Sequence, residues 1–187
     1  MKLRDIGQII VGPNPSRLRK VEAPFLYTVQ DMEDDLGQVE GQCIVSKAPD
    51  IPGMFTSNGD LVISLMKQQA AIVSQNRANK LLNANFVKYS YDRKIVDPWY
   101  ICYYLNEAEE VRWQRCRTMD LKSYTASFIG SIDIYLPTLA KQQEIGRIYK
   151  TMKHMQYLLD QQKRNWQAFT LQSIKDVLKE DQHNGRK

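Results

Sequence analysis

Amide and guanidinium side chains gather in a stretch of the chain that lacks acidic residues. Residues 61–91 contain no Asp or Glu, and two polar runs interrupt the apolar segments of this stretch. The first run is Lys67, Gln68 and Gln69, and the second contains Gln75, Asn76, Arg77 and Lys80. Amide and guanidinium groups can form paired hydrogen bonds with the edges of nucleic-acid bases. These residues are therefore candidate base-reading groups, and the alternative is an ordinary solvated loop.

Two further basic sets are candidates for contact with phosphate or base. Residues 112–124 contain Arg112, Arg115, Arg117 and Lys122 against the single acid Asp120, followed by Ser123 and Tyr124. A loop after the turn 12–15 carries Arg17, Arg19 and Lys20. The acids form a separate run at residues 31–40. A folded domain with such segregated signs can present one basic face.

The net charge by itself does not indicate a nucleic-acid partner. Residues 139–187 hold ten Lys or Arg and five Asp or Glu, so this segment supplies the whole net charge of +5. Residues 1–138 hold sixteen of each sign and sum to zero. The distribution of charge is therefore more informative than its total.

No catalytic or metal-binding motif is present, and we predict that the chain is not an enzyme. The sequence has no GxSxG, glycine-rich phosphate loop, HExxH or dinucleotide fingerprint. Asp60 has no His or second carboxylate near it in sequence and is better explained as a turn residue. The run from Asp97 to Tyr100 distantly echoes an amino-methyltransferase tetrapeptide, but a capped helix start explains it better.

Cysteine and histidine usage favours a reducing, cytoplasmic setting without a zinc site. The three cysteines, Cys43, Cys102 and Cys116, form no CxxC pair, and the two histidines are His154 and His183. No apolar run approaches the roughly 18 residues of a membrane span. The N-terminal segment resembles a short alternating strand rather than a signal peptide.

Residues 1–138 are predicted to form one α+β domain rich in strands. Alternating or apolar runs predict strands at 3–11, 25–29, 43–46, 61–65, 70–74, 83–91 and 131–136. Residues 31–41 are expected to form a turn or short helix, and 124–130 a loop or short helix. Asp97 and Pro98 predict a helix start, with an end near residues 112–116. Its aromatic residues, Trp99, Tyr100, Tyr103 and Tyr104, are expected to pack in the core rather than to stack on bases.

Residues 139–187 are predicted to form one long helix, roughly 60 Å in length, that pairs with another helix. Apolar residues recur at steps of three and four, which is a heptad seam. After Phe169 the phase slips, and Leu171, Ile174 and Leu178 continue on a rotated face. A helix folded back on its own domain is the alternative. The predicted interface residues are Ile145, Ile148, Met152, Met155, Leu159, Gln162, Trp166, Phe169 and Ile174.

Several segments together resemble the specificity subunits of type I restriction-modification systems. Residues 58–64, Asn-Gly-Asp-Leu-Val-Ile-Ser, are similar to the GDxLIS segment of that family. Residues 1–16 resemble the opening of its target-recognition domains, and residues 100–105 resemble its xYLYYxL helix. Residues 129–145 resemble its junction into the conserved helix, with Thr138 in place of the second proline. Each motif is weak alone, but their order and spacing cover essentially the whole chain.

The resemblance implies a β-rich target-recognition domain at 1–138 and a helix for dimerisation and spacing at 139–187. Full-length specificity subunits carry two such domains and two such helices, so this chain resembles a half-length form. The resemblance therefore implies a homodimer that reads a bipartite, palindromic site on double-stranded DNA, and the alternative is a pair with a different half-subunit. A methyltransferase subunit would bring S-adenosylmethionine, and a motor-nuclease subunit could add ATP and Mg²⁺. No cofactor is expected in this chain.

Two rival functions belong to other classes. The chain could be a coiled-coil adaptor that binds protein and not DNA, in which case its basic patches are solvated faces. It could also be a DNA-mimicking inhibitor, but that requires a strongly acidic surface, and the pI is about 9.0. A salt-dependent gel shift with random duplex separates the adaptor from the DNA reader.

Overall fold

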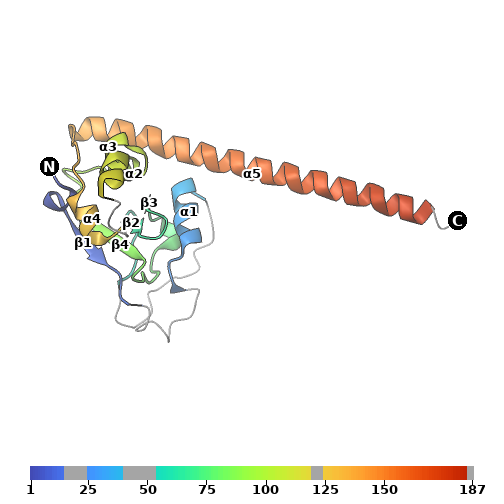
Figure 1. Ribbon diagram of the computed structural model, residues 1–187, viewed down its shortest axis with the longest axis horizontal. Helices are drawn as coiled ribbons and strands as arrows, with labels where there is room; N and C mark the ends of the chain where they lie inside the picture. The colour runs from blue at the N-terminus through green and yellow to red at the C-terminus, as the bar shows by residue number, and fades with distance from the viewer. Residues whose placement is uncertain (15–24, 40–53, 119–123, 185–187) are drawn as a thin grey trace.

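The computed structural model describes residues 1–14, 25–39, 54–118 and 124–184, with side chains up to residue 179. A small domain built on a four-stranded sheet carries one helix, α5 (Leu139–Asn184), which projects far beyond it (Figure 1). The α+β class and the long C-terminal helix predicted from the sequence are confirmed.

The sheet is antiparallel throughout and has the strand order β1-β4-β2-β3. Its strands are β1 (Gly7–Val11), β2 (Leu61–Ser64), β3 (Gln69–Ile72) and β4 (Phe86–Tyr91). Because β2 lies between β3 and β4, all four of its residues are buried, which explains its continuous apolar character. The predicted strands at 61–65, 70–74 and 83–91 are therefore confirmed to within a few residues.

Helices cover the sheet and begin at recognisable caps. The short helix α1 (Val29–Gly37) begins at Thr28, whose side chain accepts a hydrogen bond from the Asp31 backbone in a reciprocal capping box. Asp97 caps α2 (Pro98–Glu107), with Pro98 at the first helical position, as predicted. The remaining helical elements are η1 (Leu3–Asp5), η4 (Gln75–Arg77), α3 (Glu109–Thr118) and α4 (Ala126–Ser131).

Three predictions of local structure were wrong. Residues 25–29 do not form a strand, because Tyr27 is buried against Phe86 and Thr28 caps α1. Residues 131–136 contain only one isolated bridge, between Lys2 and Asp133. The helix predicted from residue 97 to 116 is interrupted at Ala108, which divides it into α2 and α3. The predicted strand at 43–46 lies outside the described residues.

The first third of α5 is fixed to the domain by polar and aromatic contacts with α2 and the segment before it. Gln142, 1% exposed, accepts a hydrogen bond from the Asp97 backbone and donates to the carbonyl oxygens of Ile95 and Pro137. A side chain at Gly146 would approach the Cβ of Trp99 to 3.0 Å, so only glycine permits this close contact. The buried Tyr149 accepts a hydrogen bond from Asn106 (2.9 Å) and packs on Trp99 and Tyr103.

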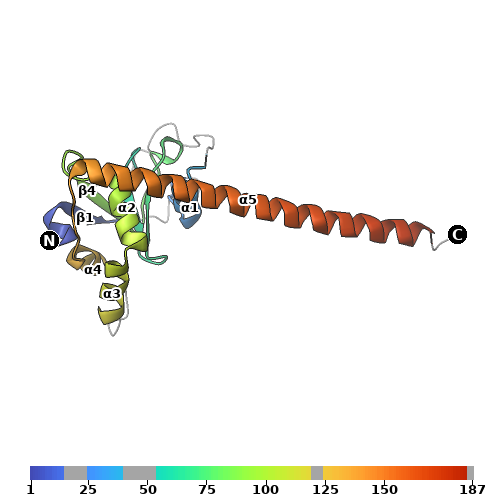
Figure 2. The same ribbon diagram turned by 90° about the horizontal axis from the view of Figure 1, so that it is seen from above.

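The end of α1 forms a second contact with α5 (Figures 1 and 2). Gln38, in a left-handed conformation (φ 56°), donates to the Lys150 carbonyl (2.7 Å). The Nδ1 of His154 donates to the carbonyl oxygen of Gly37 (2.9 Å), and the Tyr157 ring lies against the same glycine. Beyond Tyr157, every α5 residue from 158 to 179 is exposed. The aromatic residues of α2 pack in the core, as predicted, because Tyr100 and Tyr104 are buried and Trp99 and Tyr103 are half-buried against it.

Candidate nucleic-acid interface

The turn between β2 and β3 presents the first predicted set, Lys67, Gln68 and Gln69. Lys67 is exposed and forms an ion pair with Glu33 of α1 (3.1 Å). Gln68 has a left-handed backbone (φ 54°) and, like Gln69, is half-buried. An exposed ion pair of this kind is weak, so Lys67 can exchange Glu33 for a phosphate at little cost.

Arg115 connects this turn to α3, which carries the basic set that begins at Arg112. Its Nη2 donates to the carbonyl oxygens of Gln68 (3.2 Å) and Leu105 (2.7 Å) and to the Tyr124 hydroxyl (3.3 Å). Its guanidinium also lies 4.9 Å from the centre of the Tyr124 ring. The structure thus brings the turn 65–68 and the last turn of α3 together. Arg115 fixes the turn from within the fold and is only half exposed.

Arg77 and Lys80 lie inside the domain, and the acidic run on α1 explains why. The Arg77 guanidinium, 9% exposed, forms ion pairs with Asp31 (3.6 Å), Asp34 (2.8 Å) and Asp35 (3.5 Å). Lys80 Nζ lies 2.6 Å from the Asp31 carboxylate. Both cations were predicted as base-reading groups from the sequence. Their position instead holds α1 against the segment after β3, and we leave them out of the DNA surface proposed below.

Burial also changes the pKa of Asp35, one of the acidic partners in this network. Asp35 is 1% exposed, accepts a hydrogen bond from the Tyr27 hydroxyl (2.8 Å) and from the Ser74 backbone (3.0 Å), and contacts Arg77. Burial raises the pKa of the Asp35 carboxyl above its ordinary value, although the three contacts oppose that shift. The sequence signal for this network was present, because the acidic run 31–35 and the acid-free stretch 61–91 have complementary charges.

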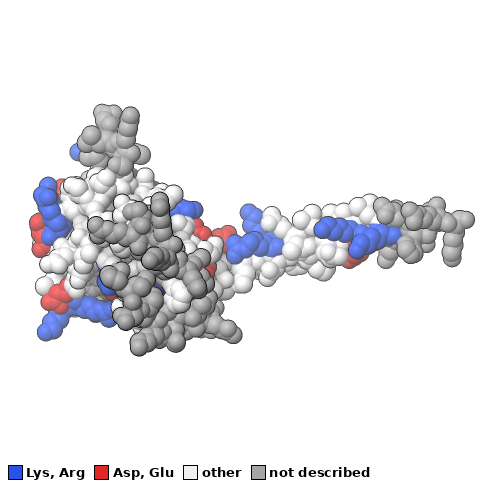
Figure 3. Space-filling view, turned by 90° about the horizontal axis from the view of Figure 1, so that it is seen from below, with Lys and Arg blue, Asp and Glu red and all other residues white. Residues whose placement is uncertain are grey.

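The remaining predicted DNA contacts are exposed, are half-buried or lie outside the described residues. Gln75 is exposed and Asn76 is half-buried, both in η4 at the edge of the domain. Arg117 is exposed on the last turn of α3. Arg17, Arg19, Lys20 and Lys122 fall outside the described residues. On the side drawn in Figure 3, basic side chains lie at the margins of the domain and in groups along α5.

The apolar seam predicted on α5 is exposed along most of its length. The exposed fractions are 59% for Ile148, 38% for Met152, 52% for Met155, 60% for Leu159, 62% for Trp166, 65% for Phe169 and 51% for Ile174. Gln162 is also exposed. Ile145 differs, because it is half-buried against the core of its own domain. A row of large apolar side chains in water is unfavourable for an isolated helix, and this row therefore indicates a partner surface.

No catalytic constellation accompanies these surfaces in the described part of the chain. Asp60 is a structural turn residue, as predicted, because it accepts a hydrogen bond from the Ser57 backbone and pairs with Lys88 (both 2.6 Å). Among the described residues, no group of three His, Cys, Asp or Glu side chains is placed to hold a metal ion. No described helix is both long and apolar enough to cross a membrane.

Comparison with solved structures defines the fold. The chain is similar to the HsdS subunit from Thermoanaerobacter tengcongensis, with a TM-score of 0.53 and 18% identity, over 83% of this chain and 37% of that one. It is also similar to a chain from a structure of type I R-M system assembly and conformational transition, with a TM-score of 0.58 and 16% identity, over 90% of this chain and 41% of that one. No family model and no curated protein sequence matches.

The protein therefore has an HsdS-like fold, in which a small mixed domain carries a long helix. The chain spans about two fifths of the length of each of the two chains that it matches. At 16–18% identity the likeness extends to the fold alone, and the function is argued below from the surfaces.

Proposed function

We propose that this chain is the DNA-recognition component of a type I restriction-modification complex, acting as a pair of copies joined through α5. The observation that carries the proposal is the projecting α5 with its exposed apolar seam, on a domain of HsdS-like fold. In this proposal the chain binds DNA and positions the partner subunits, and the partner subunits carry out the chemistry. A methyltransferase subunit supplies S-adenosylmethionine, and a motor-nuclease subunit, where one is present, supplies the ATP and Mg²⁺ site.

The seam supports pairing with an identical helix in the antiparallel direction. Leu159 and Trp166 are equally distant in sequence from a point between Gln162 and Lys163, and so are Ile148 and Val177. Met155 and Phe169 fit the same centre to within one residue. An antiparallel pair centred there therefore matches these apolar side chains on either side of a polar centre at Gln162 and Lys163. Ile148 precedes the domain-facing Tyr149 by one position, about 100° around the helix, so the docked domain leaves Ile148 exposed.

The same centre fixes the distance between the two domains. Tyr149, where α5 is docked, and its symmetry-related copy are about 27 residues apart along the paired helices, or ~40 Å. One turn of DNA is about 34–36 Å for 10–10.5 base pairs. The pair would therefore place its domains over half-sites whose centres are about 12 base pairs apart. The two-fold axis makes the half-sites inverted repeats.

The described residues available for DNA contact are the exposed or half-exposed members of the predicted sets, except Arg115, whose guanidinium is bonded within the fold. These are Lys67, Gln68, Gln69, Gln75, Asn76 and Arg117. Arg17, Arg19, Lys20 and Lys122 stay predictions of the sequence. Lys and Arg give the phosphate contacts that position the protein, and the amides give base readout. This division predicts that cation substitutions weaken all sequences alike, whereas amide substitutions relax the preference at one position.

A binding measurement at several salt concentrations tests the proposal. The chain is mixed with a random duplex and then with sequences selected from a random pool, with the methyltransferase subunit present. Salt-dependent binding and an enriched inverted repeat are expected. Absence of binding to any duplex at low salt would exclude DNA recognition by this chain.

A coiled-coil adaptor without DNA binding is the second candidate, and one observation favours it. Arg77 and Lys80, two of the cations in the acid-free stretch, are neutralised by α1. The adaptor would still pair through α5 but would show no salt-dependent binding to duplex. The same gel shift therefore decides between the two functions.

A further inference from the structure

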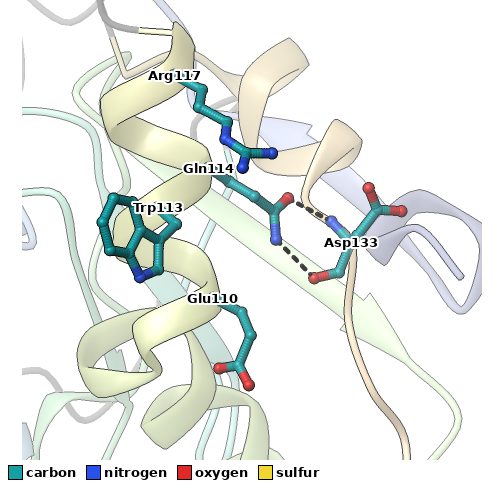
Figure 4. Close-up of a pocket in the computed structure, with 5 residues that line it drawn as sticks. All are labelled: Glu110, Trp113, Gln114, Arg117 and Asp133. Carbon is teal, nitrogen blue, oxygen red and sulfur yellow. Dashed lines mark hydrogen bonds between the residues drawn. The ribbon is translucent and has the colours of Figure 1, made fainter.

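An open cavity of about 450 Å³ lies between α3 and the segment that leads into α5 (Figure 4). One face of α3 supplies Glu110, Trp113, Gln114 and Arg117, which follow the i, i+3, i+4, i+7 spacing of a helix stripe. Asp133 forms the opposite wall. The volume lies within the range of small-molecule sites in proteins.

Gln114 fixes one wall of the cavity, whereas three other lining side chains are unpaired among the described residues. The Gln114 amide accepts a hydrogen bond from the Asp133 backbone N–H (2.7 Å) and donates to its carbonyl (3.0 Å), as the dashed lines in Figure 4 show. The side chains of Glu110, Arg117 and Asp133 form no hydrogen bond or ion pair with any described residue. Trp113 is 61% exposed on a helix that is otherwise strongly polar.

The arrangement matches the chemistry of a nucleotide. An exposed indole offers a face on which a base can stack. A guanidinium binds phosphate, and a carboxylate accepts hydrogen bonds from an exocyclic amino group. Arg117 and Glu110 are seven residues apart, about 10 Å along the helix axis, with Trp113 between them. The cavity thus offers a phosphate contact at one end, an amino-group contact at the other and a stacking surface between.

We propose that this cavity binds one unstacked nucleotide whose base carries an exocyclic amino group, such as cytosine. Trp113 stacks on the base, Glu110 accepts from its amino group, and Arg117 holds its phosphate. This goes beyond duplex readout, because a base stacked in a duplex cannot lie flat on Trp113. The site is complete within one copy and does not depend on pairing through α5.

Two labelled single-stranded hexamers, one of deoxycytidine and one of thymidine, test the site with the full chain in fluorescence anisotropy. Thymine lacks the exocyclic amino group, so the deoxycytidine hexamer should bind at least about fivefold more tightly. Trp113→Ala should weaken both by about five- to 150-fold, the range of base–aromatic stacking. Glu110→Ala should abolish the preference for deoxycytidine. The two hydrogen bonds between Gln114 and the Asp133 backbone do not involve Glu110 and persist in that variant.

Glu109→Ala is the matched control, since it removes an exposed acid from the same helix without lining the cavity. It should leave the preference unchanged. Equal binding of the two hexamers, or equal affinity of the Trp113→Ala and parent chains, would overturn the proposal and make the exposed indole a protein-contact residue. Failure of this site leaves duplex recognition intact, because that is measured with fully paired DNA.

Discussion

Substitution of Leu159 by glutamate should dissociate the proposed pair of α5 helices. Leu159 is 60% exposed in one copy, and in the antiparallel register it faces Trp166 of the second copy. Burying a leucine side chain contributes about 1.5–3 kcal/mol. The two-fold axis creates this contact twice, so the pair would lose roughly 3–6 kcal/mol. That loss raises the dissociation constant by about 10²- to 10⁴-fold.

Sedimentation equilibrium measures the effect directly, because one chain has a mass of 21.8 kDa and the pair has twice that value. Leu171→Glu is the matched control. Leu171 is also 60% exposed on α5, but it lies twelve residues further on, about 120° around the helix from Leu159. The control should remain a dimer. Equal dissociation by both substitutions, or by neither, would refute a pair built on the predicted seam.

Three further predictions concern the domain. Arg77→Ala should lower the free energy of unfolding by about 3–5 kcal/mol in urea titration, because it removes the ion-pair partner of the buried Asp35 and the half-buried Asp34. Gln75→Ala should change the free energy of unfolding by less than about 0.5 kcal/mol. Similar values for the two variants would contradict the ion-pair network. Lys67→Gln should weaken all duplexes alike and reduce the slope of log affinity against log salt by about one per bound copy, whereas an unchanged slope would remove Lys67 from the phosphate contacts. The raised pKa of Asp35 means that the folded protein binds this proton more tightly than the unfolded chain, so its contribution to stability is present at low pH and is lost as pH rises through the folded pKa. In Asp35→Asn this pH dependence should be absent from unfolding curves, and an identical dependence in both proteins would contradict the assignment.

The elements with strong local signals could be predicted from the sequence. The capped start of α2 depends on Asp97 and Pro98, which act within one turn of the chain. The heptad pattern of α5 can likewise be recognised from the local spacing of its apolar residues. The buried strand β2 begins with three consecutive apolar residues. Such signals need no knowledge of distant contacts.

The errors arose where tertiary contacts decide the structure. Residues 25–29 alternate like a strand, but Tyr27 is buried through its ring and its hydroxyl bond to Asp35. Arg77 and Lys80 were assigned from the sequence to a DNA surface without their ion pairs with α1, because the pairing of α1 with the segment after β3 is not visible locally. Ile145 has the spacing of a seam residue, but the domain covers it. In each case the local residue pattern was present, but the tertiary surface that covers it could not be predicted from that pattern.

Selection of bound sequences from a random duplex pool, with the mass of the bound protein measured on the selected duplex, tests the central claim most directly. The account predicts two copies per duplex and an inverted repeat whose half-site centres are about 12 base pairs apart. One copy on a single undivided site, or a pool without enrichment, would contradict it.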